Sequence, residues 1–264
     1  MPNPPERIRL EVEGPVGRLV LDNPGRRNAL DLAMWRAIPA LVGEAESRPG
    51  LRVLIVTAAP GLPFCAGADI AEFATVRATA EGGRAYEAAN AAAFDALAQS
   101  RLPVIAAIRG FCLGGGMGLA AACDLRIVAE AAQFGIPAGR LGVGYPPSAM
   151  AYVVAAVGAS AARDLFFTAR RIDAAEAKAL GFADRLVAEA DLDEAARGLA
   201  SEIADNAPLT LAAATAAIAL CAGLPGAPTA AACERLAAAC FDSADYAEGR
   251  AAFLDKRGPK FQGR

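Results

Sequence analysis

Alternation of apolar and polar positions predicts an antiparallel hairpin near the start of the chain. Residues 8–13 and 17–22 follow this two-residue period on either side of a Gly-Pro turn, which is the pattern of paired strands at the edge of a sheet. The next turn ends at Asp31, a residue type that caps helix N-termini, and this predicts a helix through about Ser47. The chain therefore begins as a sheet edge joined to a helix.

In the middle of the chain, strand patterns alternate with helical ones. The run LRVLIVT at 51–57 is nearly continuous, which is typical of a strand buried on both faces of a mainly parallel sheet. Further strands are predicted at 104–108 and 125–129, separated from 51–57 and from each other by an amphipathic helix over 76–100 and a small-residue helix over 115–123. This order indicates successive right-handed βαβ units.

Helical patterns dominate the rest of the chain. They cover 149–157, 160–168, 173–179, 192–206, 208–222 and 229–253, with one brief strand at 182–187. The last helices carry long alanine faces with few large side chains, which predicts packing against another subunit or across the core. We therefore expect a sheet-bearing domain at 1–200 and a helical region at 201–264.

Composition favours a globular protein. Of the 264 residues, 55% are hydrophobic and 21% are charged, and the chain is long enough to bury a large core. The formal net charge of −3 gives no reason to expect nucleic acid or an acidic membrane surface as a partner. The first residues lack a signal-peptide core, and no apolar run approaches the ~18 residues of a membrane span. We therefore expect a soluble, cytoplasmic protein.

Two features of the side-chain inventory narrow the chemistry. The chain contains no histidine, which excludes Ser-His-Asp hydrolysis, Cys-His catalysis and histidine-ligated zinc. Six cysteines are scattered without a Cys-x-x-Cys pair, so reduced, buried thiols are expected rather than a metal site or a disulfide framework. Any proton transfer must then use Asp, Glu, Tyr, Lys or Cys.

Two glycine-marked turns are candidate binding elements. Three consecutive glycines, Gly114 to Gly116, open the helix that follows the strand at 104–108. They either let this helix pack closely on the sheet or leave backbone N–H groups free to hold an anion. Their spacing matches neither the dinucleotide-binding fingerprint nor the P-loop. A second turn, CAGAD at 65–69, also follows a strand, and one N–H from each turn aimed at a common point would form an oxyanion hole.

The same segments resemble a known family. The chain contains FCAGADI at 64–70 and IRGFCLGGGMGLAAACDLRIVAEAAQFGIP at 108–137. Three further segments agree in order and spacing: RRNALD at 26–31, LFFTARRIDAAEAKALGFADRLV at 165–187 and FLDKRGPKFQGR at 253–264. Together these segments resemble the crotonase superfamily, the enoyl-CoA hydratase/isomerase group, over nearly the whole chain.

The resemblance implies a fold, an assembly and a substrate class. The fold is an α/β spiral of ββα turns forming two nearly perpendicular sheets, followed by a C-terminal helical region that makes homotrimers and usually dimers of trimers. The substrate is an acyl-CoA thioester, and coenzyme A enters as part of that substrate rather than as a separate cofactor. The thioester oxygen sits between two backbone amides, which by motif position belong to Ala68 and Gly115.

The resemblance also implies residues that bind coenzyme A. The channel for its adenine and pantetheine parts would be lined by Ala66, Gly67, Asp69 and Ile70. Its phosphates would meet basic side chains, for which the candidates are Arg26, Lys256 and Arg257.

The chain departs from the family pattern at its proton-transfer positions. The two glutamates of a typical hydratase would fall at Gly118 and Ala138, and neither residue can transfer a proton. Tyr145 resembles the placement of a tyrosine in family members that decarboxylate methylmalonyl-CoA. Another group of candidates lies between the two turns: Asp69, Glu72, Glu81, Tyr86 and Glu87.

Three functions remain open at this point. The chain is either an acyl-CoA enzyme with unusual proton-transfer groups, a malonyl-type decarboxylase that uses Tyr145, or a catalytically silent acyl-CoA-binding relative.

Overall fold

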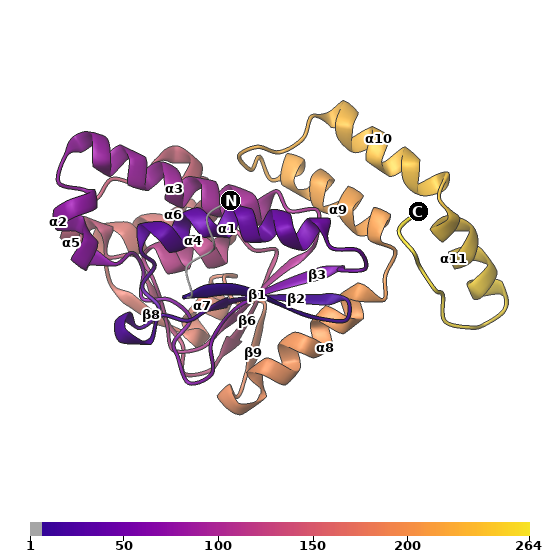
Figure 1. Cartoon of the computed structure of the whole chain (residues 1–264), viewed down its shortest axis with the longest axis horizontal. Coiled ribbons are helices and arrows are strands. Elements are labelled where there is room, and N and C mark those ends of the chain that lie inside the picture. The colour runs from indigo at the N-terminus through magenta and orange to yellow at the C-terminus, as the bar shows by residue number, and fades with distance from the viewer. Residues whose placement is uncertain (1–6) are drawn as a thin grey trace.

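The computed structural model describes residues 7–264, which form two sheets surrounded by helices (Figure 1). Strands of the larger sheet neighbour one another in the order β1 (Ile8–Glu13), β2 (Val16–Leu21), β3 (Val53–Ala58), β4 (Val104–Ile108), β6 (Leu125–Ala129) and β9 (Arg185–Val187). Only the β1–β2 pair is antiparallel among these neighbours. The smaller sheet contains β5 (Phe111–Leu113), β7 (Gln133–Gly135) and β8 (Arg171–Asp173).

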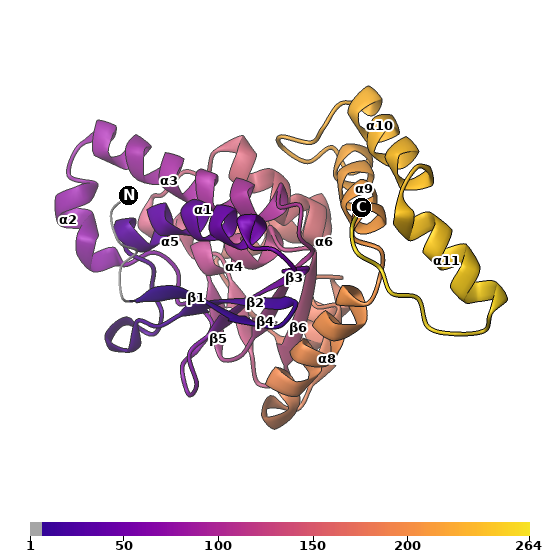
Figure 2. The same ribbon diagram turned by 45° about the vertical axis from the view of Figure 1, so that its right-hand side comes forward.

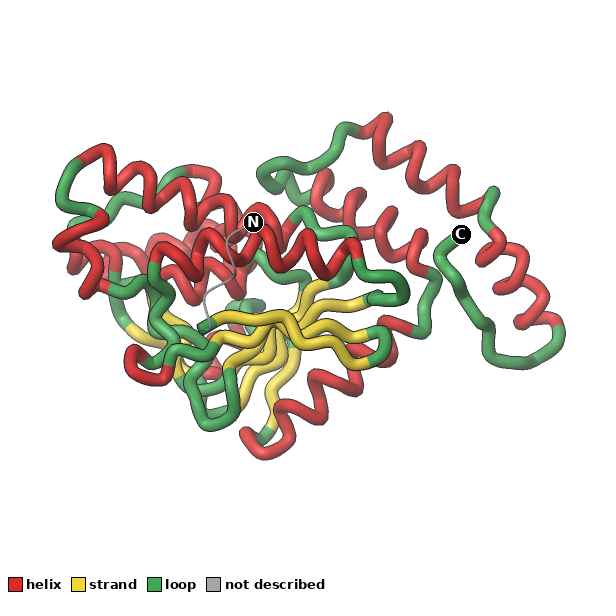
Figure 3. The backbone as a smooth tube through the Cα atoms, in the orientation of Figure 1, coloured by secondary structure: helices red, strands yellow, loops and turns green. Residues whose placement is uncertain are grey.

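Helices cover the larger sheet on both faces. The α-helices of the described chain are α1 (Leu32–Ser47), α2 (Phe73–Val76), α3 (Ala80–Ala98), α4 (Gly115–Ala121), α5 (Ala138–Leu141), α6 (Pro147–Thr168), α7 (Ala174–Ala179), α8 (Leu192–Ala204), α9 (Pro208–Cys221), α10 (Ala230–Phe241) and α11 (Ala244–Leu254). Figures 1 and 3 show α1, α3, α4 and α6 on one side of the strands and α8 on the other.

Strand β3 shows how the sheet is buried from both sides. All six of its residues are buried. Leu54 and Val56 belong to the apolar cluster that contains α1, α3 and α4 side chains, whereas Val53 and Ile55 belong to a second cluster with α8. This division follows from the two-residue period of a strand, and it explains why the sequence of β3 is continuously apolar.

The predicted mixed α/β architecture, the N-terminal hairpin and the parallel β3–β4–β6 order are confirmed. The sequence patterns missed β5 and β8, because each has only three residues and so shows no period. The strand expected from residue 182 begins only at Arg185. Its first residues instead close α7, since the N–H groups of Phe182 and Ala183 both donate to the Ala177 carbonyl.

The long helix expected over 229–253 is two helices. α10 ends at Phe241 and α11 begins after Ser243, whose hydroxyl accepts a hydrogen bond from the Tyr246 N–H. A serine at this position caps a new helix N-terminus. The break was missed because helix-forming, alanine-rich sequence lies on both sides of this serine. The two helices expected at 149–157 and 160–168 are confirmed as the two parts of α6, which meet at the non-helical Gly158 (φ 76°).

α6 is longer and more apolar than the sequence reading allowed. Within residues 7–264 it is the single helix with the length and composition to cross a membrane, or one of two spans if the sharply bent α8–α9 pair counts as another. Gly158 interrupts it, and its Tyr152, Val153 and Leu165 side chains are buried in the main apolar cluster. Only 28% of its most apolar stretch is buried in the described chain, however, so one side of α6 packs on the core while most of its length is at least partly exposed.

The C-terminal helices form a group of their own. Figure 2 shows α9, α10 and α11 projecting from the side of the molecule that lies away from α2 and α5. The preceding helix α8 still packs on the sheet up to Ala204, so the group begins slightly beyond residue 200. Its surface leaves Phe241 and Phe253 largely exposed, at 67% and 84%. The trimer remains a prediction.

The C-terminal tail folds back and is held at two places. The buried Asp245 carboxylate accepts hydrogen bonds from the N–H groups of Gln262 and Gly263, at 2.6 and 2.7 Å. Arg52, beside β3, donates to the carbonyls of Ala204 and Phe261. The tail therefore connects α11 to the edge of the sheet-bearing domain.

All six cysteines are free thiols. Cys65, Cys112, Cys123 and Cys233 are buried as expected, but Cys240 is half-buried and Cys221 is exposed. Cys221 is the last residue of α9 and belongs to the C-terminal helical group.

Candidate active site

The turn after β3 brings a glycine against the turn after β5. Gly67 has φ of +108°, which favours glycine, and a Cβ there would lie 3.0 Å from the Leu113 carbonyl oxygen. Backbone hydrogen bonds fix the turn, because the Leu30 N–H donates to the Gly67 carbonyl at 2.8 Å and the Leu113 N–H donates to the Cys65 carbonyl at 2.9 Å. The two glycine turns of the sequence are therefore neighbours in space.

The backbone amides of Ala68 and Gly115 lie close together at this junction. The Cβ position of Gly115 is 3.9 Å from the Ala68 nitrogen, and the Cβ position of Gly67 is 3.8 Å from the Gly115 nitrogen. Within residues 7–264 neither N–H donates a hydrogen bond. Both residues line one pocket, so the two turns supply two unused donors to the same space.

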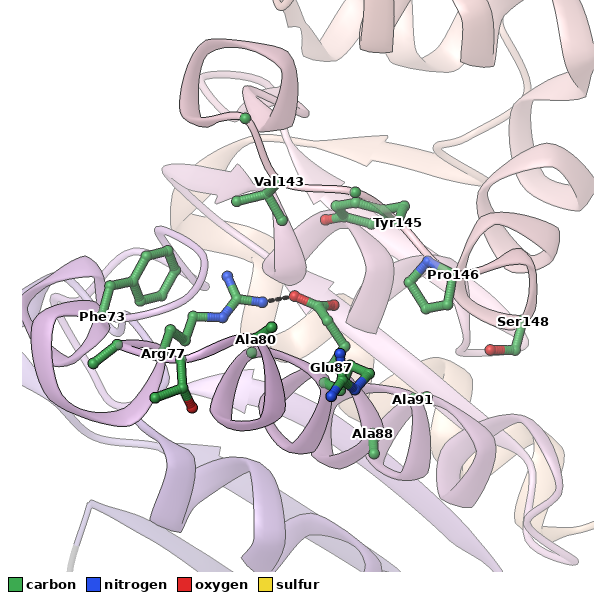
Figure 4. A pocket seen from close by; sticks show the side chains of 16 residues that line it. Phe73, Arg77, Ala80, Glu87, Ala88, Ala91, Val143, Tyr145, Pro146 and Ser148 are labelled. Atoms are coloured by element: carbon green, nitrogen blue, oxygen red, sulfur yellow. Dashed lines mark ion pairs between the residues drawn. The ribbon is translucent and has the colours of Figure 1, made fainter.

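This inner pocket is small and mostly apolar. Its volume is about 80 Å³, and it borders an outer groove of about 980 Å³ with which it shares five residues. The shared residues are Phe73, Arg77, Glu87, Val143 and Tyr145. Figure 4 shows Arg77 and Glu87 pointing toward one another, with Val143 and Tyr145 facing them from the other wall.

The two positions where the family usually carries glutamates are occupied differently. A Cβ on Gly118 would lie 2.7 Å from Cζ of Phe94, so the Phe94 ring of α3 fills the space of a larger residue at 118. Phe94 is itself fixed by an edge-to-face contact with Trp35, with ring centroids 5.8 Å apart. Ala138 opens α5, is buried, and lines the inner pocket with its methyl group.

Tyr145 lies in the wall between pocket and groove. Its ring packs edge-to-face on Phe166, with centroids 4.9 Å apart, and burial raises the pKa of its hydroxyl. The group therefore keeps its proton at neutral pH and acts as a hydrogen-bond donor or acceptor rather than as a base.

The opposite wall carries an ion pair. Arg77 and Glu87 are paired, and the Arg77 guanidinium lies 4.4 Å from the ring centroid of Phe73 and 4.5 Å from that of Tyr86. Burial lowers the pKa of Arg77. One turn along α3 from Glu87, Asn90 is buried, and its Nδ2 has no hydrogen-bond partner in the described part of the chain. The lining residues of the inner pocket include both Glu87 and Asn90.

The structure assigns structural roles to three of the open candidates. Asp69 caps the turn after it by accepting from the Ala71 N–H, and Glu72 accepts from the Leu32 N–H. The Tyr86 hydroxyl accepts from Trp35 Nε1 and donates to the Leu30 carbonyl, both at 3.1 Å. Glu81 lines neither pocket nor groove.

The residues suggested for coenzyme A fall into two places. Ala66, Gly67 and Ile70 line the inner pocket, and Arg26 lies beside it, 3.6 Å from the carboxylate of Asp69. Lys256 and Arg257 follow α11, in the helical group at the far end of the molecule from α2 and α5 (Figure 1). Arg257 is held there by Glu248, so one chain does not bring these two basic residues to the pocket.

Sequence reasoning left Glu87 in a group of five and missed Arg77, Asn90 and Phe94. A signal was present, because Glu87, Asn90 and Phe94 recur at helical spacing within the predicted helix over 76–100 and therefore share one face of it. In residues 7–264 no three acidic or cysteine side chains gather in a group that could hold a metal ion.

The fold and the pocket define an α/β protein whose candidate site is built from two glycine turns and one face of a helix. Residues 11–264 match the model of the Enoyl-CoA hydratase/isomerase family, and the chain belongs to this family. It is an enzyme of the hydratase/isomerase type that acts on acyl-CoA.

Sequence and structure comparisons align this chain with similar proteins over nearly its full length. A protein named as a probable enoyl-CoA hydratase in Mycobacterium leprae is 36% identical over 252 residues, which cover 93% of this chain and 94% of that protein. The short-chain-enoyl-CoA hydratase of Clostridium acetobutylicum is 34% identical, with 95% of each chain covered. The crystal structure of an enoyl-CoA hydratase/isomerase family protein from Hyphomonas neptunium superposes with a TM-score of 0.92, at 42% identity and 98% coverage of both chains.

Proposed function

We propose that this enzyme holds the oxygen of an acyl-CoA thioester between the N–H groups of Ala68 and Gly115 and stabilises the enolate that forms there. The observation that supports the proposal is the meeting of two unused amides at one pocket. Donors fixed in this way favour the charged intermediate over the neutral thioester, because they are already oriented where negative charge develops.

The surroundings suit a thioester of coenzyme A. A small inner pocket favours a short acyl group, while the groove beside it is large enough for the extended pantetheine chain. Arg26 is exposed near the pocket and is a candidate for a phosphate contact. Lys256 and Arg257 reach a pocket only from another copy, in the predicted homotrimer or dimer of trimers. In this proposal coenzyme A enters as part of the substrate, and no separate cofactor takes part.

The test removes one donor and leaves the turn otherwise intact. Ala68→Pro deletes the N–H, whereas Ala68→Gly keeps it and serves as the matched control. Loss of one such donor lowers turnover by about 10²- to 10³-fold. The assay is hydration of crotonyl-CoA, followed by loss of its enoyl absorbance, alongside acyl-CoA binding and the melting temperature. A folded proline variant with undiminished turnover would remove Ala68 from the proposal.

Decarboxylation of a malonyl-type thioester is the second candidate, because the same enolate forms when CO₂ leaves. Tyr145 lines the pocket opposite the Arg77 cation, which is suited to a substrate carboxylate. This candidate requires Tyr145→Phe to lower the rate of CO₂ release.

The third function left open by the sequence, a silent acyl-CoA-binding relative, rests on Gly118 and Ala138, which cannot transfer protons, and the hydratase relatives disfavour it. It requires tight binding of CoA esters without turnover. Measurable hydration of crotonyl-CoA excludes it.

A further inference from the structure

The candidate site has its amides but lacks a proton-transfer group at the positions where the family carries one. The Phe94 ring fills the space that a side chain at position 118 would need, and Ala138 contributes only a methyl group. Proton transfer therefore requires a group from another element. Of the residues that line the inner pocket, Glu87 alone is a carboxylate, and it stands on α3.

The position of Glu87 is linked to that of Phe94. The two residues are seven apart on α3, two helical turns, and so occupy the same face of the helix. One face thus closes the space at Gly118 with a ring and presents a carboxylate further along the same pocket. Relative to the family pattern, the glycine at position 118 and the carboxylate on α3 therefore belong together, because both depend on the same face of α3.

Asn90 adds a donor between them. Asn90 is only 8% exposed, it lines the inner pocket, and its Nδ2 has no partner in residues 7–264. A buried amide without a partner is costly, and a ligand oxygen in the pocket would remove this cost. A carboxylate that accepts and an amide that donates are together suited to a hydroxyl group or a water molecule, which can do both.

Arg77 holds the Glu87 carboxylate in place by pairing with it. It pairs with Glu87 while its guanidinium packs on the Phe73 and Tyr86 rings, so its side chain is only 11% exposed. Arg77 is therefore a positioning residue, because it acts on the reaction through Glu87.

We propose that Glu87 is the acid/base residue of this enzyme and that Asn90 orients the reacting water or hydroxyl oxygen. This inference rests on the proposed function. In hydration, Glu87 takes a proton from water as the water oxygen bonds to Cβ. The electron pair of the double bond moves to the thioester oxygen, held by Ala68 and Gly115. Glu87 then returns the proton to Cα, and the net change is addition of one water.

The experiment compares Glu87→Gln with wild type in crotonyl-CoA hydration. Glutamine keeps the size of the side chain and removes its ability to transfer a proton. The expected result is a loss of kcat by 10²- to 10⁴-fold, the range of general acid/base catalysis, with little change in KM. The control is Glu44→Gln, which breaks an exposed ion pair with Arg48 on α1 and should leave kcat unchanged.

Two further variants keep the test decisive. Glu87→Asp retains a carboxylate and should restore part of the lost turnover, even if Glu87→Gln lowers stability. Arg77→Lys keeps the charge and should stay more active than Arg77→Met, with the midpoint of the pH–rate profile displaced in the methionine variant. If folded Glu87→Gln hydrates crotonyl-CoA as fast as wild type, the role of Glu87 is wrong while the proposed function stands.

Failure of the proposed function looks different. In that case wild-type protein binds neither crotonyl-CoA nor butyryl-CoA, whatever residue stands at position 87. Wild-type protein that binds crotonyl-CoA but never hydrates it overturns the role of Glu87 and leaves acyl-CoA binding in place.

Discussion

One wall of the inner pocket is made of backbone and the other of side chains. The backbone wall holds the Ala68 and Gly115 amides and is fixed by close approach of two turns, where Gly67 leaves no room for a side chain. The side-chain wall holds Glu87 and Asn90 and is fixed by packing of α3 and its neighbours. Backbone donors such as the Ala68 and Gly115 amides do not depend on which side chains are present. The proton-transfer groups are side chains, so substitution can move them from one element to another.

The largest loss of stability is expected at the contact between Gly118 of α4 and Phe94 of α3. Gly118→Glu would restore the glutamate of the family pattern, but its Cβ would meet the Phe94 ring at 2.7 Å. Overpacking together with a buried charge should lower the free energy of unfolding by about 3 kcal/mol, measured by urea denaturation. Adding Phe94→Ala should recover part of this loss. An equally stable single variant would show that Phe94 moves aside freely.

A smaller loss is expected from the backbone wall itself. Gly67→Ala forces a side chain onto a residue with φ of +108°, 3.0 Å from the Leu113 carbonyl oxygen. The expected destabilisation is about 2 kcal/mol, measured by thermal or urea unfolding, and turnover should fall with it because the Ala68 amide moves. The control is Gly43→Ala on α1, where the added methyl meets nothing within 4 Å.

Asn90→Ala separates orientation from proton transfer on the side-chain wall. Removing the unpaired Nδ2 leaves the fold with one less unsatisfied buried group, so stability should hold or rise slightly. Turnover of crotonyl-CoA should fall about tenfold, since one neutral hydrogen bond to the oxygen is lost at ~1.4 kcal/mol. Steady-state kinetics check this, and an unchanged kcat would show that Asn90 contacts no reacting oxygen.

The smallest effect is expected at Tyr145. Tyr145→Phe keeps the packing on Phe166 and should change crotonyl-CoA hydration by less than about threefold, because no proton passes through this hydroxyl in the mechanism with Glu87. Rates with crotonyl-CoA and with a malonyl-type thioester make the check. A large loss confined to the malonyl-type substrate would instead favour decarboxylation.

The two walls also differ in how far the sequence predicted them. The glycine turns lie in short contiguous motifs, so the pairing of Ala68 with Gly115 could be proposed from spacing and resemblance. The contact between Phe94 and Gly118 joins residues 24 positions apart through the packing of α3 on α4, and no local pattern specifies it. For the same reason Glu87 could not be ranked above Glu72 until the structure showed that Glu72 caps the Leu32 N–H.

At the level of the fold, residues with strong local patterns were predicted and short or tertiary features were not. The apolar run of β3 is decided by its own six residues, whereas β8 exists because Ile172 pairs with Phe134 of β7. The break between α10 and α11 depends on a single hydroxyl, that of Ser243.

The folded-back tail has a practical consequence for anyone who handles this protein. Asp245 receives its hydrogen bonds from Gln262 and Gly263, and the Arg264 carbonyl in turn accepts from the Asp245 N–H. Residues 262–264 thus hold the start of α11 in place through hydrogen bonds to Asp245. Deleting these residues would leave the buried Asp245 carboxylate without the donors that the tail supplies and would free the start of α11 from the sheet-bearing domain.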